Sequence, residues 1–183
     1  MNRAMCIASL VLAAATTLAA CGGEDLATAD GLPTAVPIEH HEGAVCGMIV
    51  RDQSAPRAQV LHRDGTRSFL CSIGDLLAYL QAPSPHGEAL AIMVEVMDPD
   101  EDPMETHTGP HPWVPAGEAT YVLGVRRKGI MGEPVLVYRD RAAAEAAVGA
   151  AAAVIVGFDG LERWWNDLHD EATGDANPVG GSG

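Results

Sequence analysis

Residues 59–85 read QVLHRDGTRSFLCSIGDLLAYLQAPSP, and this stretch decides the fold. Residues 59–62 are mostly apolar and of strand length, and the Asp-Gly pair after them is typical of a tight turn. Ser72 is a residue type that caps helices. The segment that it begins places its apolar side chains on one helical face: Ile73, Leu76, Leu77 and Leu80. The sequence therefore predicts a helix over 72–81, which the prolines after it end.

Apolar segments flank this stretch on both sides. Residues 45–50 (VCGMIV) and 89–97 (ALAIMVEVM) have strand length and few charges. We therefore expect the order strand, strand, helix, strand over about 45–97. Residues 98–105 (DPDEDPME) read as an acidic linker, because they lack the spacing and the glycine of a calcium-binding loop.

The second half of the chain repeats that order. Strand patterns cover 120–125, 134–138 and 153–158, and a helix pattern covers 140–148. A weak sequence likeness supports a duplication, because VLHRD ends at Asp64 before one helix and VLVYRD ends at Asp140 before the other.

An amphipathic helix over about 161–172 should complete the domain. We expect an α+β fold of two similar strand-strand-helix-strand units plus this C-terminal helix. The expected division is a domain over 45–172, with units at about 45–97 and 119–158, and a disordered tail at 173–183.

The N-terminal residues have the pattern of a bacterial lipoprotein signal. Arg3 supplies a positive charge, an apolar run follows, and the order Leu-Ala-Ala-Cys ends at Cys21. We therefore expect residues 1–20 to be a cleaved signal peptide, Cys21 to carry the lipid anchor, and residues 21–44 to be a flexible linker. No Asp directly follows Cys21, which in Gram-negative lipoproteins indicates the outer membrane, with the domain facing the periplasm.

Composition and charge exclude several classes of function. The chain has 183 residues, 48% of them hydrophobic, which is enough for a folded core. It carries 25 acidic and 11 basic side chains, and basic residues cluster only at 126–128, so nucleic acid is not an expected partner. The sequence contains no nucleophile elbow, phosphate-binding loop, dinucleotide fingerprint or zinc-protease helix. We therefore expect a protein that is not an enzyme.

Sulfur side chains are the residues best suited to chemistry. Cys46 and Met48 would share one face of a strand, and Gly47 between them permits a close approach. A thiolate with a thioether is a soft ligand set that selects Cu(I) over magnesium, calcium or manganese. Met131 lies between glycines in a basic hairpin, where packing alone does not explain it, and is the expected third ligand. Packing in the core is the alternative explanation of the Cys-Gly-Met motif.

Other residues near Cys46 leave further options open. His40 and His41 are additional imidazole candidates, with His107 and His111 next, and Cys71 is an additional sulfur candidate. Cys46 and Cys71 are also the only cysteines that follow Cys21, so an oxidising compartment could join them in a disulfide. One alternative function is therefore a structural lipoprotein that has this disulfide and binds no metal.

Several motifs occur in a specific order along the chain. They are Cys46-Gly47-Met48, then Phe69 and Cys71-Ser72 before a helix, then Trp113 before a small-residue strand, and then Met131-Gly132. Together with the lipoprotein signal, this order resembles the NosL family of copper-binding lipoproteins, which assist the maturation of nitrous oxide reductase. Leu70, inserted between Phe69 and Cys71, departs from the family's pattern.

The resemblance implies a function as well as a fold. It implies a Cu(I) site made by Cys46, Met48 and Met131, a second metal, zinc, close by, and a homodimer. It also implies a membrane-anchored periplasmic metallochaperone that delivers Cu(I) to apo nitrous oxide reductase and its ABC-type maturation complex. An alternative of another class is an enzyme resembling organomercurial lyases, for which Cys46, Cys71 and Asp75 would have to converge.

Overall fold

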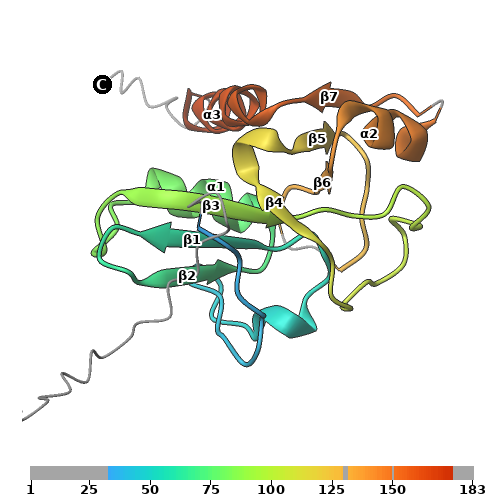
Figure 1. The fold of residues 1–183 in the computed structure, drawn as a ribbon. Coiled ribbons are helices and arrows are strands. Elements are labelled where there is room, and N and C mark those ends of the chain that lie inside the picture. The colour runs from blue at the N-terminus through green and yellow to red at the C-terminus, as the bar shows by residue number, and fades with distance from the viewer. Residues whose placement is uncertain (1–32, 130–131, 150, 175–183) are drawn as a thin grey trace, which may run out of the picture.

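The structure is a computed structural model that describes residues 33–129, 132–149 and 151–174. It contains seven strands in two antiparallel sheets together with helices, which confirms the predicted α+β class (Figure 1). Among the described residues, no helix is long and apolar enough to cross a membrane.

The first sheet comes from the first half of the chain. It has the order β2-β1-β3-β4, and every neighbouring pair is antiparallel. Its strands are β1 (Ala58–His62), β2 (Arg67–Leu70), β3 (Ala89–Glu95) and β4 (Trp113–Pro115). Helix α1 (Ile73–Gln81) connects β2 to β3.

Local sequence signals explain this first unit. The Asp64 side chain accepts a hydrogen bond from the Thr66 amide at 2.8 Å, and Gly65 takes a φ of 85°, which closes the turn between β1 and β2. The Ser72 hydroxyl accepts a hydrogen bond from the Asp75 amide at 3.0 Å, which confirms Ser72 as the helix cap.

The second sheet repeats the topology of the first. Its order is β6-β5-β7, as β2-β1-β3 is in the first sheet, and both pairs are antiparallel. The elements are β5 (Thr120–Leu123), β6 (Val135–Tyr138), α2 (Arg141–Val148) and β7 (Val154–Val156). Asp140 caps α2 as Ser72 caps α1, so the two units have corresponding strand-strand-helix-strand paths.

Two details of the first unit differ from the sequence prediction. Residues 45–50 are not a strand, because Gly47 has a φ of 70° and the segment turns back on itself before the short 3-10 helix η1 (Val50–Asp52). The first two strands of the unit are therefore β1 and β2. Asp64 lies in the turn between them whereas Asp140 caps a helix, so the VLHRD and VLVYRD segments are not structurally equivalent.

The packed part of the chain also begins earlier than residue 45. The Val36 amide and carbonyl both hydrogen-bond the Gln59 side chain, at 3.0 and 2.6 Å, which ties part of the predicted linker to β1. At the other end, the final helix α3 (Phe158–Gly174) starts before the predicted residue 161.

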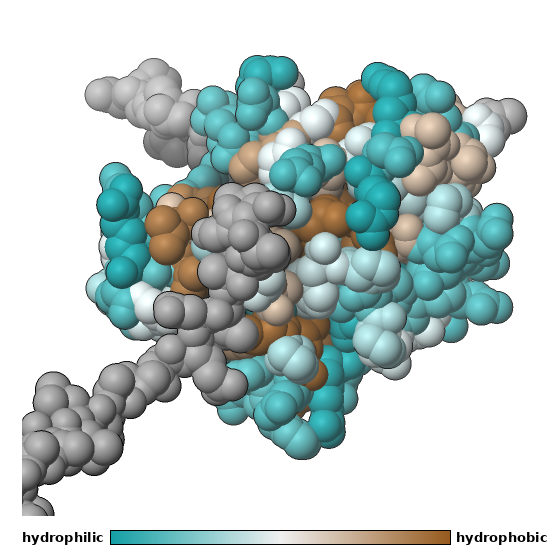
Figure 2. Space-filling model, in the orientation of Figure 1, coloured by the Kyte–Doolittle hydropathy of each residue, from teal (hydrophilic) through white to brown (hydrophobic). Residues whose placement is uncertain are grey.

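One apolar core joins the two units. Side chains of α1 and of both sheets are buried together with Leu161 and Trp165 of α3, and the 3-10 helix η2 (Ala116–Glu118) adds Ala116 to the same cluster. Figure 1 shows α2 and α3 beside the second sheet, and Figure 2 shows hydrophilic residues over much of the visible surface. In this arrangement the loop that contains Cys46, before β1, lies beside the first turn of α1.

Candidate metal centre

Cys46 lies on a tight loop rather than on a strand. The Gly43 amide donates to the Met48 carbonyl at 2.7 Å, and the Gly47 amide donates to the Gly43 carbonyl at 2.8 Å. The Ala44 amide donates to the Phe69 carbonyl at 2.9 Å, which attaches the loop to β2. Backbone hydrogen bonds therefore fix Cys46 beside the end of β2.

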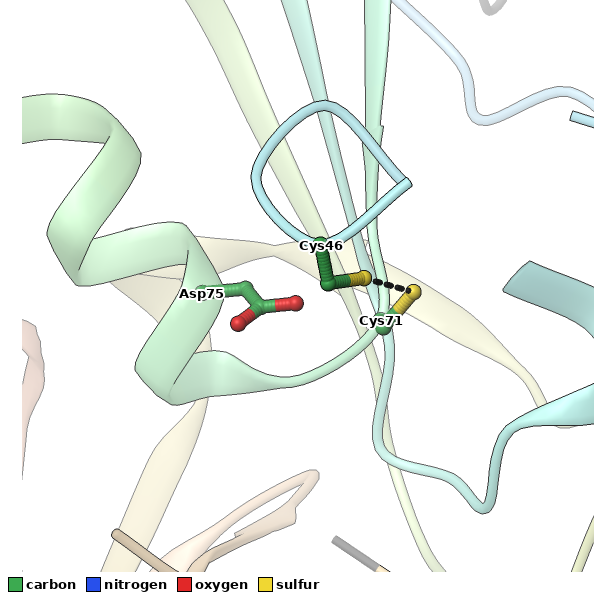
Figure 3. Close-up of side chains that lie close together, drawn as sticks. All are labelled: Cys46, Cys71 and Asp75. Carbon is green, nitrogen blue, oxygen red and sulfur yellow. Dashed lines mark hydrogen bonds between the residues drawn. The ribbon is translucent and has the colours of Figure 1, made fainter. Parts of the chain in front are cut away.

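Cys71 follows β2 directly and lies against the same loop. Its Sγ is 2.9 Å from the Sγ of Cys46, and both thiols are free (Figure 3). A bonded pair would be about 2.05 Å apart, so the two sulfurs are adjacent without a disulfide. Gly43 permits this approach, because a Cβ there would lie 2.6 Å from the Cys71 Sγ and 2.7 Å from the Cys46 Sγ.

Asp75 completes the cluster from the first turn of α1. A carboxylate oxygen of Asp75 and the two sulfurs lie within 4.8 Å of one another, and Figure 3 shows the carboxylate beside the Cys46 sulfur. The Asp75 Oδ2 is buried and has no hydrogen-bond partner in the described part of the chain. A buried acceptor without a partner is costly, and a cation between this oxygen and the sulfurs would satisfy it.

Burial affects the two thiols differently. Cys46 is half-buried, whereas Cys71 is 5% exposed. Burial raises the pKa of the Cys71 thiol above its ordinary value of 9.0, and the hydrogen bond with Cys46 and the charges of Cys46 and Asp75 raise that pKa further. Without a cation, Cys71 therefore keeps its proton at neutral pH, and a bound metal ion would have to displace it.

The other predicted ligands lie in different places. Met48 is half-buried and packs with Val50, Phe69 and Cys71, so it borders the cluster. Exposed His41 stacks on Phe69, with ring centroids 3.9 Å apart. His40 is also exposed, and neither histidine belongs to the Cys46, Cys71 and Asp75 cluster.

Two predicted residues, Met131 and Cys21, lie outside the described residues. The chain that follows Met131 nevertheless lies close to the first turn of α1. A Cβ at Gly74 would lie 3.6 Å from the Glu133 carbonyl oxygen and 3.8 Å from the Glu133 nitrogen. Glu133 therefore packs against Gly74 in the first turn of α1. Gly74 directly precedes Asp75 in the chain.

Asp75 is not among the copper ligands expected from the sequence, where it has a role only in the enzyme alternative. The spacing between Cys71 and Asp75 could have indicated this role. A helix that begins just after Cys71 places the residue four positions later, Asp75, next to Cys71. The loop containing Cys46 could not be placed in the same way, because its contact with β2 is formed between distant parts of the sequence.

Comparison with known proteins identifies the family. The family model described as NosL matches residues 35–164. The chain belongs to the NosL family. It is 28% identical over 131 residues to a copper-binding lipoprotein NosL of Stutzerimonas stutzeri, a match that covers 69% of this chain and 66% of that protein. It is 32% identical over 143 residues to the copper-binding lipoprotein NosL of Achromobacter cycloclastes, with 74% and 70% covered.

A solved NosL structure has the same fold. The crystal structure of the copper chaperone NosL from Shewanella denitrificans matches with a TM-score of 0.56 and 24% sequence identity. The match covers 69% of this chain and 93% of that one. The duplicated architecture described above is therefore the fold of a NosL protein.

Proposed function

We propose that this NosL protein is a Cu(I) metallochaperone of the bacterial envelope. The observation that carries the proposal is the convergence of Cys46 and Cys71, with sulfurs 2.9 Å apart, at a half-buried edge of the domain. Adjacent thiols are soft ligands that suit Cu(I). The names of the two curated relatives, both copper-binding lipoproteins, support the same cargo.

The proposed Cu(I) ligands are Cys46, Met48 and Met131. Cys46 has the more accessible sulfur, because it lies on the surface loop while Cys71 is buried behind it. Met48 borders the cluster through its contacts with Val50, Phe69 and Cys71. The packing of Glu133 on Gly74 supports Met131 as the third ligand, since Met131 is two residues before Glu133 in the chain.

Cys71 and Asp75 suit a neighbouring second metal. A carboxylate oxygen is a poor ligand for Cu(I) but an ordinary one for zinc, which also accepts thiolate. The uncompensated Oδ2 of Asp75 supports a cation at this position. We assign zinc to this role, and the Cys71 sulfur, 2.9 Å from that of Cys46, would be available to either metal.

Copper leaves the site by ligand exchange. An incoming ligand from the recipient replaces one sulfur at a time on the exposed side, so no covalent bond of the chain is made or broken. Apo nitrous oxide reductase and its ABC-type maturation complex are the proposed recipients. The acidic side chains, 25 against 11 basic ones, would steer the chain toward a basic docking surface.

The proposed location follows from the N-terminal sequence and the family. Cleavage before Cys21 and lipidation of that residue would anchor the domain to the outer membrane, facing the periplasm, and residues 22–32 would separate the domain from the lipid. A homodimer in this location would present two copper sites to the recipient.

The direct test is copper transfer. The Cu(I)-loaded chain is mixed with apo nitrous oxide reductase and its maturation complex, and copper in the separated reductase is measured over time. We expect faster transfer than from a Cu(I)-chelator complex at the same free Cu(I) concentration, and we expect Cys46→Ala to abolish the advantage. Equal rates from the chain and from the chelator would contradict a chaperone role.

The convergence of Cys46, Cys71 and Asp75 also favours a second candidate, an organomercurial-lyase-like enzyme. In such a reaction the carbon–mercury bond breaks, the carbon takes a proton from Asp75 or a thiol, and Hg²⁺ stays on the two sulfurs. The test is incubation with phenylmercury and measurement of benzene. Benzene release that is lost in Asp75→Asn would support the enzyme, and no release would discard it.

A further inference from the structure

One carboxylate and two imidazole side chains lie close together outside the sulfur site. They border a cavity of about 690 Å³ between the 98–112 segment and the start of α2. Glu101 is at the centre of this cluster: its Oε1 lies 2.8 Å from the Nε2 of His111 and 3.9 Å from the Nδ1 of His107. The three side chains are 21%, 8% and 19% exposed, in that order, so the cluster is largely shielded from solvent.

Backbone carbonyls determine which imidazole nitrogens have protons. The Nδ1 of His111 lies 2.9 Å from the Gly109 carbonyl, and the Nε2 of His107 lies 2.9 Å from the Asp102 carbonyl. A carbonyl oxygen only accepts, so these two nitrogens donate. In the neutral rings, the opposite nitrogens therefore present lone pairs toward Glu101.

A lone pair that faces a carboxylate repels it, so the 2.8 Å contact between the His111 Nε2 and the Glu101 Oε1 requires either a proton on that nitrogen or a metal ion that both atoms bind. Glu101 has a second unmet requirement, because its Oε2 is buried and has no hydrogen-bond partner in the part of the chain that the structure describes. A ring that donates one nitrogen to a backbone carbonyl and presents the other to a cation is the usual arrangement of a metal-binding histidine.

Hydrogen bonds from the first unit hold the backbone of the 107–109 segment in place. The buried Arg57 guanidinium donates to the Gly109 carbonyl at 2.8 Å and to the Thr108 carbonyl at 3.3 Å. The His107 amide donates to the Ser54 hydroxyl at 3.1 Å, and its carbonyl accepts from the Ala55 amide at 2.8 Å. Both histidines are therefore on a segment that the first unit fixes.

We propose that His107, His111 and Glu101 bind a divalent cation of borderline softness, with Zn²⁺ as its representative. Two imidazoles and a carboxylate suit Zn²⁺ or Cu²⁺ rather than Cu(I), and the open cavity leaves room for water as a further ligand. Asp98 and Asp140 also line the cavity and favour a cation, while Arg139 opposes it. This site does not depend on the sulfur site or on the proposed copper delivery.

The test is a Zn²⁺ titration of the mature lipidated chain in detergent, measured by calorimetry, because cleavage removes Cys6 and the lipid occupies the Cys21 sulfur. Cys46→Ser and Cys71→Ser are introduced together, so that thiolates do not take the metal. We expect one Zn²⁺ per chain, and affinity at least about tenfold weaker after His107→Gln or His111→Gln. His86→Gln is the matched control, because the His86 Nδ1 also lies 3.1 Å from a carboxylate, that of Asp64, but on the exposed surface.

Two results would overturn the proposal. They are an absence of Zn²⁺ binding in the chain that carries Cys46→Ser and Cys71→Ser, and binding that both histidine substitutions leave unchanged. Ring-nitrogen NMR of the chain with all its histidines intact keeps the test valid if a variant fails to fold. Zn²⁺ should shift the His107 Nδ1 and His111 Nε2 signals, and a response to pH alone would show that only a proton bridges the cluster.

The test is independent of the copper chaperone proposal. The chain that carries Cys46→Ser and Cys71→Ser lacks the thiols of the sulfur site, so Zn²⁺ binding by this chain reports on the histidine cluster. If Zn²⁺ does not bind the histidine cluster, Cu(I) binding by the intact chain is unaffected. If Cu(I) does not bind the sulfur site, the Zn²⁺ titration still decides on the histidine cluster.

Discussion

The sulfur atoms of Cys46 and Cys71 lie 2.9 Å apart although the residues are 25 positions apart in the chain. Gly43 lies against both sulfurs, and its missing Cβ provides the space that they occupy. The soft-metal site therefore depends on a glycine that would not itself bind any metal.

Gly43→Ala should weaken Cu(I) binding while the fold persists. The new Cβ would lie 2.6 and 2.7 Å from the two sulfurs, so the loop or Cys71 must move. We expect affinity to fall at least about tenfold and the free energy of unfolding to fall by about 1–3 kcal/mol. Gly117→Ala is the control, because no atom lies within 4 Å of a Cβ at that position. Equal Cu(I) affinity in the two variants would show that Gly43 does not set the site.

Oxidation should disable the site reversibly. The two sulfurs are close enough that a small movement would bring them to the bonded distance of about 2.05 Å, and a disulfide leaves no thiolate for Cu(I). We expect a chain that starts at residue 22 to lose both free thiols and its Cu(I) affinity after oxidation, and to regain both with reductant. Thiol counting beside Cu(I) titration measures this, and Cu(I) binding by the fully oxidised chain would argue against thiolate ligands.

The metal-free protein should lose stability at alkaline pH because of Cys71. Its folded-state pKa is raised above 9.0, so the folded state holds this proton more tightly than the unfolded state does. The resulting stabilisation is complete below the unfolded pKa and is lost as pH rises above it. Between pH 8.5 and 10 we expect a loss of at most about 1.4 kcal/mol per pH unit from this one proton.

Urea unfolding at several pH values measures that slope. Cys71→Ser should flatten it, and the difference between the two chains isolates the thiol from the buried tyrosines, whose pKa values are also raised. An identical slope in Cys71→Ser would contradict the assignment.

The ion pair between Arg57 and Glu95 should be the costliest charge pair to break. Both side chains are buried, at 2% and 1% exposed, and Glu95 accepts two side-chain hydrogen bonds from Arg57. Glu95→Gln leaves a buried guanidinium without its counter-charge, so we expect the free energy of unfolding to fall by about 3–5 kcal/mol. Glu88→Gln, in an exposed pair with Arg63, should cost less than about 1 kcal/mol. Denaturant unfolding compares the two, and similar losses would be inconsistent with this view of the core.

Periodicity and caps were sufficient to predict most of the fold. Helix α1 begins directly after its predicted cap, Ser72, and α2 begins within one residue of its predicted start at 140, because a cap and an apolar face are local properties of the sequence. The 45–50 segment was misread, since an apolar run of strand length is also compatible with a loop that packs on a sheet. Its turn at Gly47 depends on hydrogen bonds to Gly43 that sequence patterns do not reveal.

The site was predictable in its chemistry and less so in its geometry. The choice of sulfur ligands followed from residue types, so Cys46 and Cys71 could be named. The contact between their sulfurs could not be predicted, because it depends on the backbone hydrogen bond between Ala44 and Phe69, which are far apart in the sequence. His107 and His111 could be named as imidazole candidates from the sequence. Their grouping around Glu101 could not be predicted, because the acidic 98–105 segment has no metal-binding spacing of its own.

The central claim is that Cys46, Met48 and Met131 bind Cu(I). The decisive measurement is an anaerobic Cu(I) titration of the chain from residue 22 against a chromophoric chelator. We expect Cys46→Ala to abolish competition with the chelator and Met131→Leu to weaken binding by at least about tenfold. Met104→Leu, at an exposed methionine, should bind like the unsubstituted chain. Binding that neither Cys46→Ala nor Met131→Leu changes would contradict the copper site.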